Sequence, residues 1–223
     1  MSTERFSGAG WFNLGTNITV IGCGSIGNTL AVNLLMHGHK VTIYDHDTVG
    51  EENVFVQGFS RDHIGMAKVD AMHEIYMSMV EDPFKEYDEP NATLIAEAWD
   101  NHDIDDIVIM AVDSIDVRKQ IYEYLIANKE TFMFIDARVA AEQFEIYNVI
   151  KSKIASNDHL YPATLFNADE AAPVNCTYKM TRHVAQICQG YMIAMLNNHL
   201  LNAKYGEEIY PYVFGKGFNT IDL

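Results

Sequence analysis

A glycine-rich turn between a short apolar strand and a helical pattern constrains the fold of this chain most. The strand is expected over residues 18–21, the helix over 25–37, and a second strand over 40–44. The glycines are Gly22, Gly24 and Gly27. Such a turn lets the backbone approach a phosphate and points a helix N-terminus at its negative charge. The pattern predicts a nucleotide site; a turn kept only for packing is the alternative.

Strand-like and helix-like segments alternate along the rest of the chain. Helices are expected over 62–80 (with Asp62 as N-cap), 115–128 and 177–201, and strands over 92–96, 107–112, 131–135 and 142–150. The last strand alternates as an antiparallel strand does. We predict an α/β, Rossmann-like, doubly wound mixed sheet, mostly parallel with antiparallel strands at one side. It would be a single domain over 1–223, with a nucleotide-binding half at about 17–136 and a substrate and crossover half at about 137–223.

Charge and composition narrow the class of partner. The chain has 31 acidic and 15 basic residues and a formal charge of −16, which argues against nucleic acid or an anionic membrane, because phosphates are bound by Lys and Arg. No apolar run approaches the roughly 20 residues of a membrane span, and the first 16 residues lack a signal-peptide core. A cytoplasmic protein is expected. The three cysteines and nine histidines show no zinc-binding spacing.

Asp45 ends the second expected strand, 23 residues after Gly22. A carboxylate at this position accepts hydrogen bonds from both ribose hydroxyls and repels a ribose phosphate. NAD and ATP satisfy this requirement equally, and NADP is disfavoured. An NAD-dependent oxidoreductase therefore remains an alternative at this point.

Further motifs follow in a fixed order. They are Asp45-His-Asp47-Thr-Val49, Asn53-Val-Phe-Val-Gln57, Ile64-Gly65-Met-Ala-Lys68, and Val112-Asp113-Ser114 with Arg118 after it. The series resembles the adenylyltransferase domain of the ubiquitin-activating-enzyme-like family of ThiF, MoeB and HesA proteins. The resemblance covers about residues 17–198. Its second half adds Asp136-Ala-Arg138, the strand to Tyr147, and Cys176-Thr177 before a helix.

The resemblance implies ATP-dependent activation of a carboxylate. The acid attacks the α-phosphate of ATP and gives an acyl-adenylate and pyrophosphate, with Mg²⁺ as the metal. The implied substrate is the C-terminus of a small ubiquitin-like or sulfur-carrier protein, although a peptide or a modified nucleoside carboxylate is also compatible. The family likeness further implies a homodimer.

The resemblance also assigns roles to individual residues. The nucleotide-binding set is Gly22, Gly24, Ser25, Gly27, Asp45, Asp47, Asn53, Gln57, Lys68, Asp113 and Arg118. Within it, Asn53 and Lys68 would contact phosphates and Asp113 would hold magnesium. Arg118 would lie near the nucleotide or brace the Asp113 loop. The simpler alternatives are a solvated lysine for Lys68 and a helix N-cap for Asp113.

One position departs from the family pattern N-x-x-R-Q. Val56 stands where a phosphate-binding arginine is expected, and the loss of such a contact raises a barrier by about 2–4 kcal/mol. Arg61 in the same loop, and Arg5, which resembles an arginine that reaches into the partner's site in family dimers, are candidate replacements. Without compensation, the chain would be a degenerate member that binds a nucleotide or a partner without turnover.

The cysteines offer one candidate nucleophile. Cys176 precedes an expected helix, whose dipole favours a thiolate, and related enzymes form covalent intermediates through a cysteine in this region. A small residue at a helix start is the alternative. Cys188 is expected in the core, and Cys23 is a small residue tolerated in the glycine-rich turn.

Overall fold

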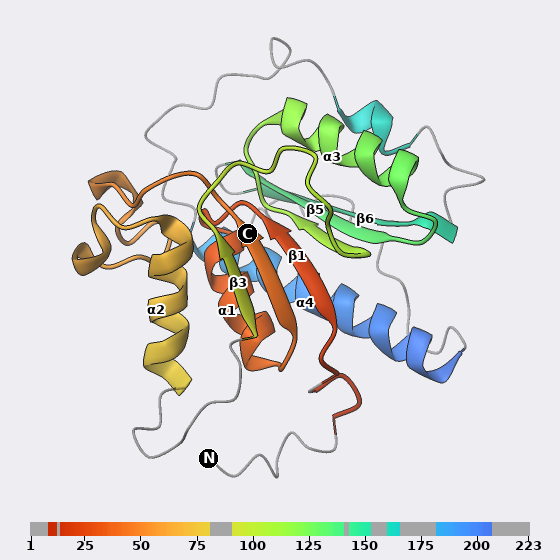
Figure 1. Cartoon of the computed structure of the whole chain (residues 1–223), viewed down its shortest axis with the longest axis horizontal. Coiled ribbons are helices and arrows are strands. Elements are labelled where there is room, and N and C mark those ends of the chain that lie inside the picture. The colour runs from red at the N-terminus through yellow and green to blue at the C-terminus, as the bar shows by residue number, and fades with distance from the viewer. Residues whose placement is uncertain are drawn as a thin grey trace, which may run out of the picture.

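A six-stranded sheet forms the centre of the protein in a computed structural model (Figure 1). The structure describes residues 9–12, 14–80, 91–140, 143–152, 160–165 and 182–206. The strands are β1 (Asn17–Ile21), β2 (Lys40–Tyr44), β3 (Ala92–Ile95), β4 (Ile107–Met110), β5 (Met133–Ala140) and β6 (Gln143–Ile150). Their order is β3-β2-β1-β4-β5-β6. All neighbouring pairs are parallel except β5 and β6, so the predicted mixed sheet is confirmed.

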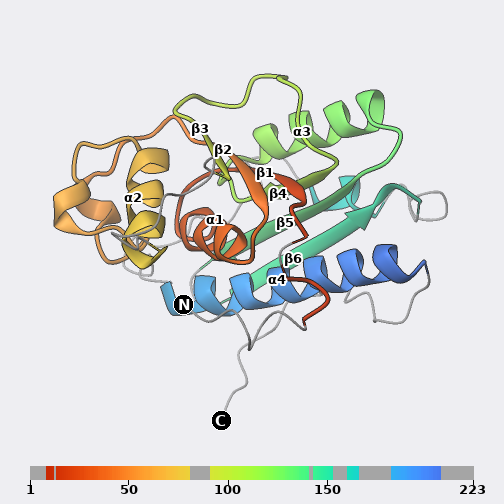
Figure 2. The same ribbon diagram turned by 60° about the horizontal axis from the view of Figure 1, so that its bottom comes forward.

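Helices cover both faces of the sheet. They are α1 (Gly27–Met36), α2 (Lys68–Val80), α3 (Ile115–Asn128) and α4 (Arg182–Tyr205). Figure 2 shows α3 on one face and α1 and α4 on the other. The completely buried strand β4 contributes side chains to the hydrophobic clusters on both faces of the sheet, because successive side chains of a strand point to opposite faces. Ile107 and Ile109 pack in the cluster with α1 and α4, whereas Val108 and Met110 pack in the cluster with α3.

Three expected boundaries were wrong by four residues or more, and the other expected boundaries that fall on described residues differ by at most two residues. The helix expected from Asp62 begins at Lys68, because Arg61–His63 form a separate 3₁₀ turn capped at Ser60 and Gly65 then adopts a left-handed φ of +89°. Strand β5 continues to Ala140 rather than ending at residue 135, because β6 pairs along its whole length. Helix α4 extends four residues beyond Leu201.

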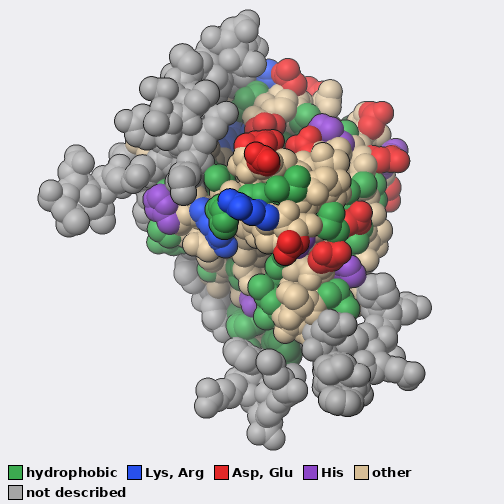
Figure 3. All heavy atoms as spheres, turned by 90° about the vertical axis from the view of Figure 1, so that its left-hand side faces the viewer, with side chains coloured by type: hydrophobic (Ala, Val, Ile, Leu, Met, Phe, Trp, Pro, Cys, Tyr) green, Lys and Arg blue, Asp and Glu red, His purple; other side chains and the backbone are tan. Residues whose placement is uncertain are grey.

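The surface carries charge of both signs. On the face in Figure 3, several Lys and Arg side chains gather near the centre, with Asp and Glu side chains above them and to their lower right. Of the helices among the described residues, none combines the length and apolar character needed to cross a membrane.

Candidate nucleotide-binding site

A cleft of about 510 Å³ opens at the carboxyl ends of β1, β2 and β4. This is where open α/β sheets bind ligands, and the volume lies within the usual range of small-molecule sites. Nine predicted residues line it: Gly22, Gly24, Ser25, Asp45, Asp47, Gln57, Lys68, Asp113 and Arg118. The fold therefore brings together residues that are up to 96 positions apart in the sequence.

In the glycine-rich turn, one glycine has space for a side chain and two do not. Gly22 has a φ of +100°, and a Cβ there would lie 2.5 Å from the Ala111 carbonyl oxygen. A Cβ on Gly27 would overlap the Gly22 carbonyl oxygen. Gly24, in contrast, has no atom within 4 Å of its added Cβ and lines the cleft. The turn is thus tight on its protein side and leaves room for a ligand on its open side.

Helix α1 presents its N-terminus to this opening without a side-chain cap. The first N–H groups of a helix need acceptors from outside it, and a phosphate supplies them. Gln189 on α4 fixes the glycine-rich turn to that helix, because its Nε2 donates to the carbonyls of Ser25 and Ile26, each at 3.0 Å. Sequence reasoning missed this glutamine because its partners lie more than 160 residues away.

Asp45 is fixed by the backbone around it. Its Oδ2 accepts from the Cys23 N–H at 2.5 Å, and its Oδ1 accepts from the Asp47 N–H at 2.8 Å. The carboxylate lies at the end of β2 and lines the cleft. Each oxygen retains a lone pair for a ribose hydroxyl, so the residue fits its predicted role.

Lys68 begins α2 and is 6% exposed. Its Nζ donates to Asp47 Oδ2 at 2.8 Å, and this hydrogen bond lowers the pKa of Asp47. The solvated-lysine alternative is therefore wrong. The ammonium group lines the cleft with its position set by Asp47, and two of its three donors have no partner among the described residues.

Asp113 is exposed, lines the cleft, and receives no hydrogen bond at its carboxylate from the described residues. It is not the helix cap: the Ser114 hydroxyl accepts from Val117 N at 3.3 Å and caps α3. Arg118 donates to the carbonyls of Val112 and, at 3.3 Å, Asp113. The second of the two roles considered for Arg118, bracing the Asp113 loop, matches this geometry.

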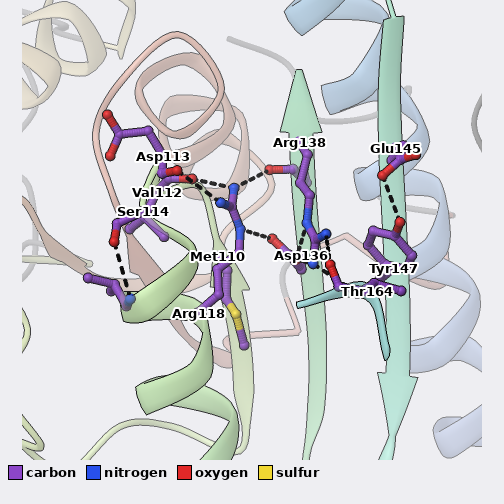
Figure 4. Close-up of polar contacts among 12 residues, drawn as sticks. Met110, Val112, Asp113, Ser114, Arg118, Asp136, Arg138, Glu145, Tyr147 and Thr164 are labelled. Atoms are coloured by element: carbon purple, nitrogen blue, oxygen red, sulfur yellow. Dashed lines mark hydrogen bonds and ion pairs between the residues drawn. The ribbon is translucent and has the colours of Figure 1, made fainter. Parts of the chain in front are cut away.

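A buried carboxylate joins Arg118 to a second arginine (Figure 4). Asp136 on β5 has no exposed surface. Its Oδ1 accepts from Arg118 Nε at 2.7 Å, and its Oδ2 accepts from Arg138 Nε at 2.9 Å and from the Tyr161 hydroxyl at 3.1 Å. Arg138 also lines the cleft. The D-A-R motif was noted in the sequence, but neither residue was assigned to the site.

Besides Gly27, four predicted residues are not found in the lining that the described residues form. Asn53 is buried and its Oδ1 accepts from Gly50 N at 2.8 Å; it does not line the cleft. Arg61 is exposed outside the cleft lining. Arg5 and Cys176 lie outside the described residues. The roles assigned to these four residues stay predictions.

The other two cysteines are fully buried. Burial, followed by the nearby Asp45 carboxylate, raises the pKa of the Cys23 thiol. Burial raises the pKa of Cys188 to about 12. Both thiols remain protonated near neutral pH, so neither has the properties of a nucleophile, and the expected core position of Cys188 is confirmed.

Candidate metal ligands occur at two places. Asp45, His46 and Asp47 are the single group of three such ligands close enough to share an ion among the described residues. Three of their four carboxylate oxygens already accept hydrogen bonds, from Cys23 N, Asp47 N and Lys68 Nζ. Asp113 is a lone free carboxylate across the cleft. Magnesium characteristically uses one or two carboxylates together with substrate phosphates, so the predicted ligand Asp113 fits Mg²⁺ when a nucleotide is bound.

The sequence model of the ThiF family matches residues 14–215. Solved structures share the fold. E. coli MccB with ATP has a TM-score of 0.65 and 17% identity, covering 88% of this chain and 58% of that one. E. coli MccB with MccA has a TM-score of 0.63 and 16% identity, with the same coverage.

PaaA has a TM-score of 0.63 and 15% identity, covering 91% of this chain and 59% of that one. This chain thus spans less than two thirds of the MccB and PaaA chains it matches. A search among curated proteins gives no match.

Proposed function

Since the chain belongs to the ThiF family, we propose that it adenylates a carboxylate with ATP. The observation that carries the proposal is the convergence of Gly24, Asp45, Lys68 and Asp113 on one cleft. They provide, in that order, space for a phosphate, acceptors for ribose, a cation, and a free carboxylate for magnesium.

The chemistry follows from these positions. An oxygen of the acid's carboxylate attacks the α-phosphorus of ATP, the bond from that phosphorus to the bridging oxygen breaks, and pyrophosphate leaves with the bond electrons. The N–H groups at the start of α1 and the Lys68 ammonium stabilise charge on the phosphates. Bound Mg²⁺ would supply further charge neutralisation, with Asp113 as its protein ligand. The protein's main contribution is to hold both reactants in position.

The proposed acid is the C-terminus of a polypeptide. A small ubiquitin-like or sulfur-carrier protein is the substrate that we favour from the sequence resemblance. The structure of MccB with MccA, in a protein of the same fold, supports looking for a protein or peptide substrate first. A homodimer, a cytoplasmic location and roles for Arg5, Arg61 and Cys176 belong to the same proposal.

A melting experiment with Mg·ATP, with ATP plus EDTA, and with NAD tests the nucleotide. A ligand at a hundred times its dissociation constant stabilises by about 2.7 kcal/mol. We expect stabilisation by Mg·ATP and not by NAD. Stabilisation by NAD alone would instead favour an oxidoreductase.

Turnover is tested next by ATP–pyrophosphate exchange with candidate polypeptides. Exchange that depends on a free C-terminal carboxylate, and is lost when the same polypeptide is amidated, supports adenylation. Val56 favours a second candidate function, a member that binds ATP without turnover. Nucleotide binding with no exchange for any acid offered would select that candidate.

A further inference from the structure

Strand β5 extends further than β4, its parallel neighbour in the sheet. Its pairing with β4 ends at Met110 and Asp136, whereas its pairing with β6 continues to Ala140. Residues 137–140 therefore project past the carboxyl end of β4, and β6 is the only strand that pairs with them among the described residues. The first three of them line the cleft, so the β5–β6 hairpin forms a wall at the end of the cleft away from β2.

Charge is distributed unevenly along the cleft. Asp45 and Asp47 lie after β2, where Lys68 pairs with Asp47, and Asp113 follows β4. Arg118 and Arg138 lie at the β5 end. In the sheet, β2 and β5 are separated by β1 and β4, which places them about 14 Å apart at the usual strand spacing. A nucleotide with its ribose at Asp45 and its phosphates at the start of α1 leaves the β5 end for the acid.

Arg138 is held in a fixed orientation. Nε donates to Asp136 at 2.9 Å, Nη1 to the Thr164 carbonyl at 2.8 Å, and Nη2 to the Thr164 hydroxyl at 3.0 Å. Nη2 also pairs with Asp136 Oδ2 at 2.8 Å. The guanidinium carbon lies 4.5 Å from the centre of the Tyr147 ring. Of its five N–H groups, one on Nη1 has no partner among the described residues.

The buried cluster around Arg138 carries a net positive charge. Arg118 and Arg138 share the single carboxylate of Asp136, and the Tyr161 hydroxyl that donates to Asp136 is neutral, because burial, followed by Asp136, strongly raises its pKa. Within this cluster, two guanidinium groups against one carboxylate leave one excess positive charge, while the Asp113 carboxylate lines the cleft on the β4 side. An anion at this end of the cleft is therefore favoured.

We propose that Arg138 is the specificity-determining residue for the acid substrate and donates its remaining Nη1 hydrogen to the acid's carboxylate. This inference rests on the proposed adenylation. One carboxylate oxygen binds Arg138 while the other attacks the α-phosphorus, and after pyrophosphate leaves, Arg138 holds the carbonyl oxygen of the acyl-adenylate. The acid is thereby oriented toward the phosphate before reaction. Arg138 acts on the acyl part of the ligand and not on the nucleotide.

A pair of defined ligands separates these two parts. The probes are AMP and 5′-O-(N-acetylsulfamoyl)adenosine, an analogue of acetyl-adenylate, each titrated calorimetrically into the full chain. The variants are Arg138→Gln, Arg138→Lys and the control Arg182→Gln, which removes an exposed arginine that does not line the cleft. Melting temperatures are measured for all variants.

In Arg138→Gln, affinity for the acyl analogue is expected to fall about tenfold while affinity for AMP changes less than twofold. Arg138→Lys keeps the charge without the planar fork and should lose an intermediate amount. Arg182→Gln should bind both ligands like the wild type. Equal losses for both ligands, or unchanged binding of the analogue, would overturn the inference.

Two further outcomes have distinct meanings. If Arg138→Gln melts too low for titration, Arg138→Lys decides the matter, because unchanged analogue binding in that variant contradicts a contact with the acyl group. If the wild type binds neither AMP nor the analogue, the proposed function itself fails, independently of Arg138.

Discussion

Gly27 faces the carbonyl oxygen of Gly22 so closely that any side chain on Gly27 would overlap it. This relationship closes the glycine-rich turn on its inner side, where α1 packs against the end of β1. Gly24, two residues after Gly22, faces open space instead. The glycines of one motif therefore have different physical functions, and substitutions can separate them.

Gly27→Ala is expected to destabilise the fold. The added methyl group must displace backbone at the start of α1 and meets the Ala111 side chain as well. We expect a loss of about 2–4 kcal/mol in the free energy of unfolding, in the range of strained core substitutions. Urea unfolding followed by circular dichroism measures it. A loss below 0.5 kcal/mol would contradict the close packing.

Gly24→Ala is the matched substitution, expected to affect binding and not stability. Its methyl group projects into space that a phosphate would use. The melting temperature should stay within about 1 °C of the wild type, while ATP affinity falls about tenfold, or about 1.4 kcal/mol. Calorimetric titration with ATP checks this. Unchanged ATP affinity would place the phosphates elsewhere.

Lys68→Met tests the cation of the cleft. We expect ATP–pyrophosphate exchange to fall at least 100-fold, or about 2.7 kcal/mol in barrier, because a buried ammonium next to the phosphates is removed. Asp47 loses its hydrogen-bond partner but is exposed to water, so the melting temperature should change little. Adenosine, which lacks phosphates, should bind as it does to the wild type. A matching loss of adenosine affinity would indicate a disturbed cleft instead.

Asp136→Asn tests the buried cluster beneath the cleft. The substitution leaves Arg118 and Arg138 without the carboxylate that they share, at a position, Asp136, that has no exposed surface. Breaking a buried ion pair from one side typically costs about 3–5 kcal/mol of folding stability. Asp116→Asn, which removes the exposed partner of Lys119 at 3.7 Å, is the control and should leave the urea midpoint unchanged. Equal midpoints for the two variants would contradict the role of Asp136.

His39 should make stability depend on pH. It is fully buried, neither ring nitrogen has a partner among the described residues, and burial, followed by the neighbouring His37, lowers its pKa to about 4. Between that value and 6.5 the unfolded chain binds a proton that the folded chain does not. Stability is therefore complete above pH 6.5 and falls as the pH decreases toward 4.

From pH 7.5 to 5.0, His39 should cost about 2 kcal/mol of unfolding free energy, measured by urea titration. His39→Leu removes this titration and should flatten the dependence, leaving smaller contributions from His37 and His199, whose pKa values burial also lowers. An equally steep dependence in His39→Leu would exclude His39 as the cause.

Local patterns predicted those parts of the site that come directly after strands. Gly22, Asp45 and Asp113 each follow a short apolar strand, and the ordered motifs placed Lys68. The structure adds what local pattern cannot carry. Gln189 donates a hydrogen bond to Ser25, which lies 164 positions earlier in the sequence. Arg138 lines the cleft because β5 continues beyond the end of β4. The strand predicted over 131–135 ended before residues 137–139 of β5, which form the wall of the cleft.

Capping shows the same limit at short range. Asp113 and Ser114 are adjacent, and both residue types favour helix N-caps. Only the geometry of the turn decides between them: Ser114 caps α3, and the carboxylate of Asp113 accepts no hydrogen bond from the part of the chain that the structure describes. Whether the cap is Asp113 or the next residue thus determines whether the Asp113 carboxylate has a structural role or is available to a ligand.

The unequal lengths of β4 and β5 have an evolutionary consequence. The proposed ribose and phosphate contacts come from the ends of β1 and β2 and the start of α2, whereas the far wall belongs to a hairpin whose last residues pair only with each other. Under the proposed function, substitutions along that hairpin would exchange one acid for another while the nucleotide-binding residues remain unchanged. Sequence divergence in such a fold would change the acid that is activated before it changes the binding of the nucleotide.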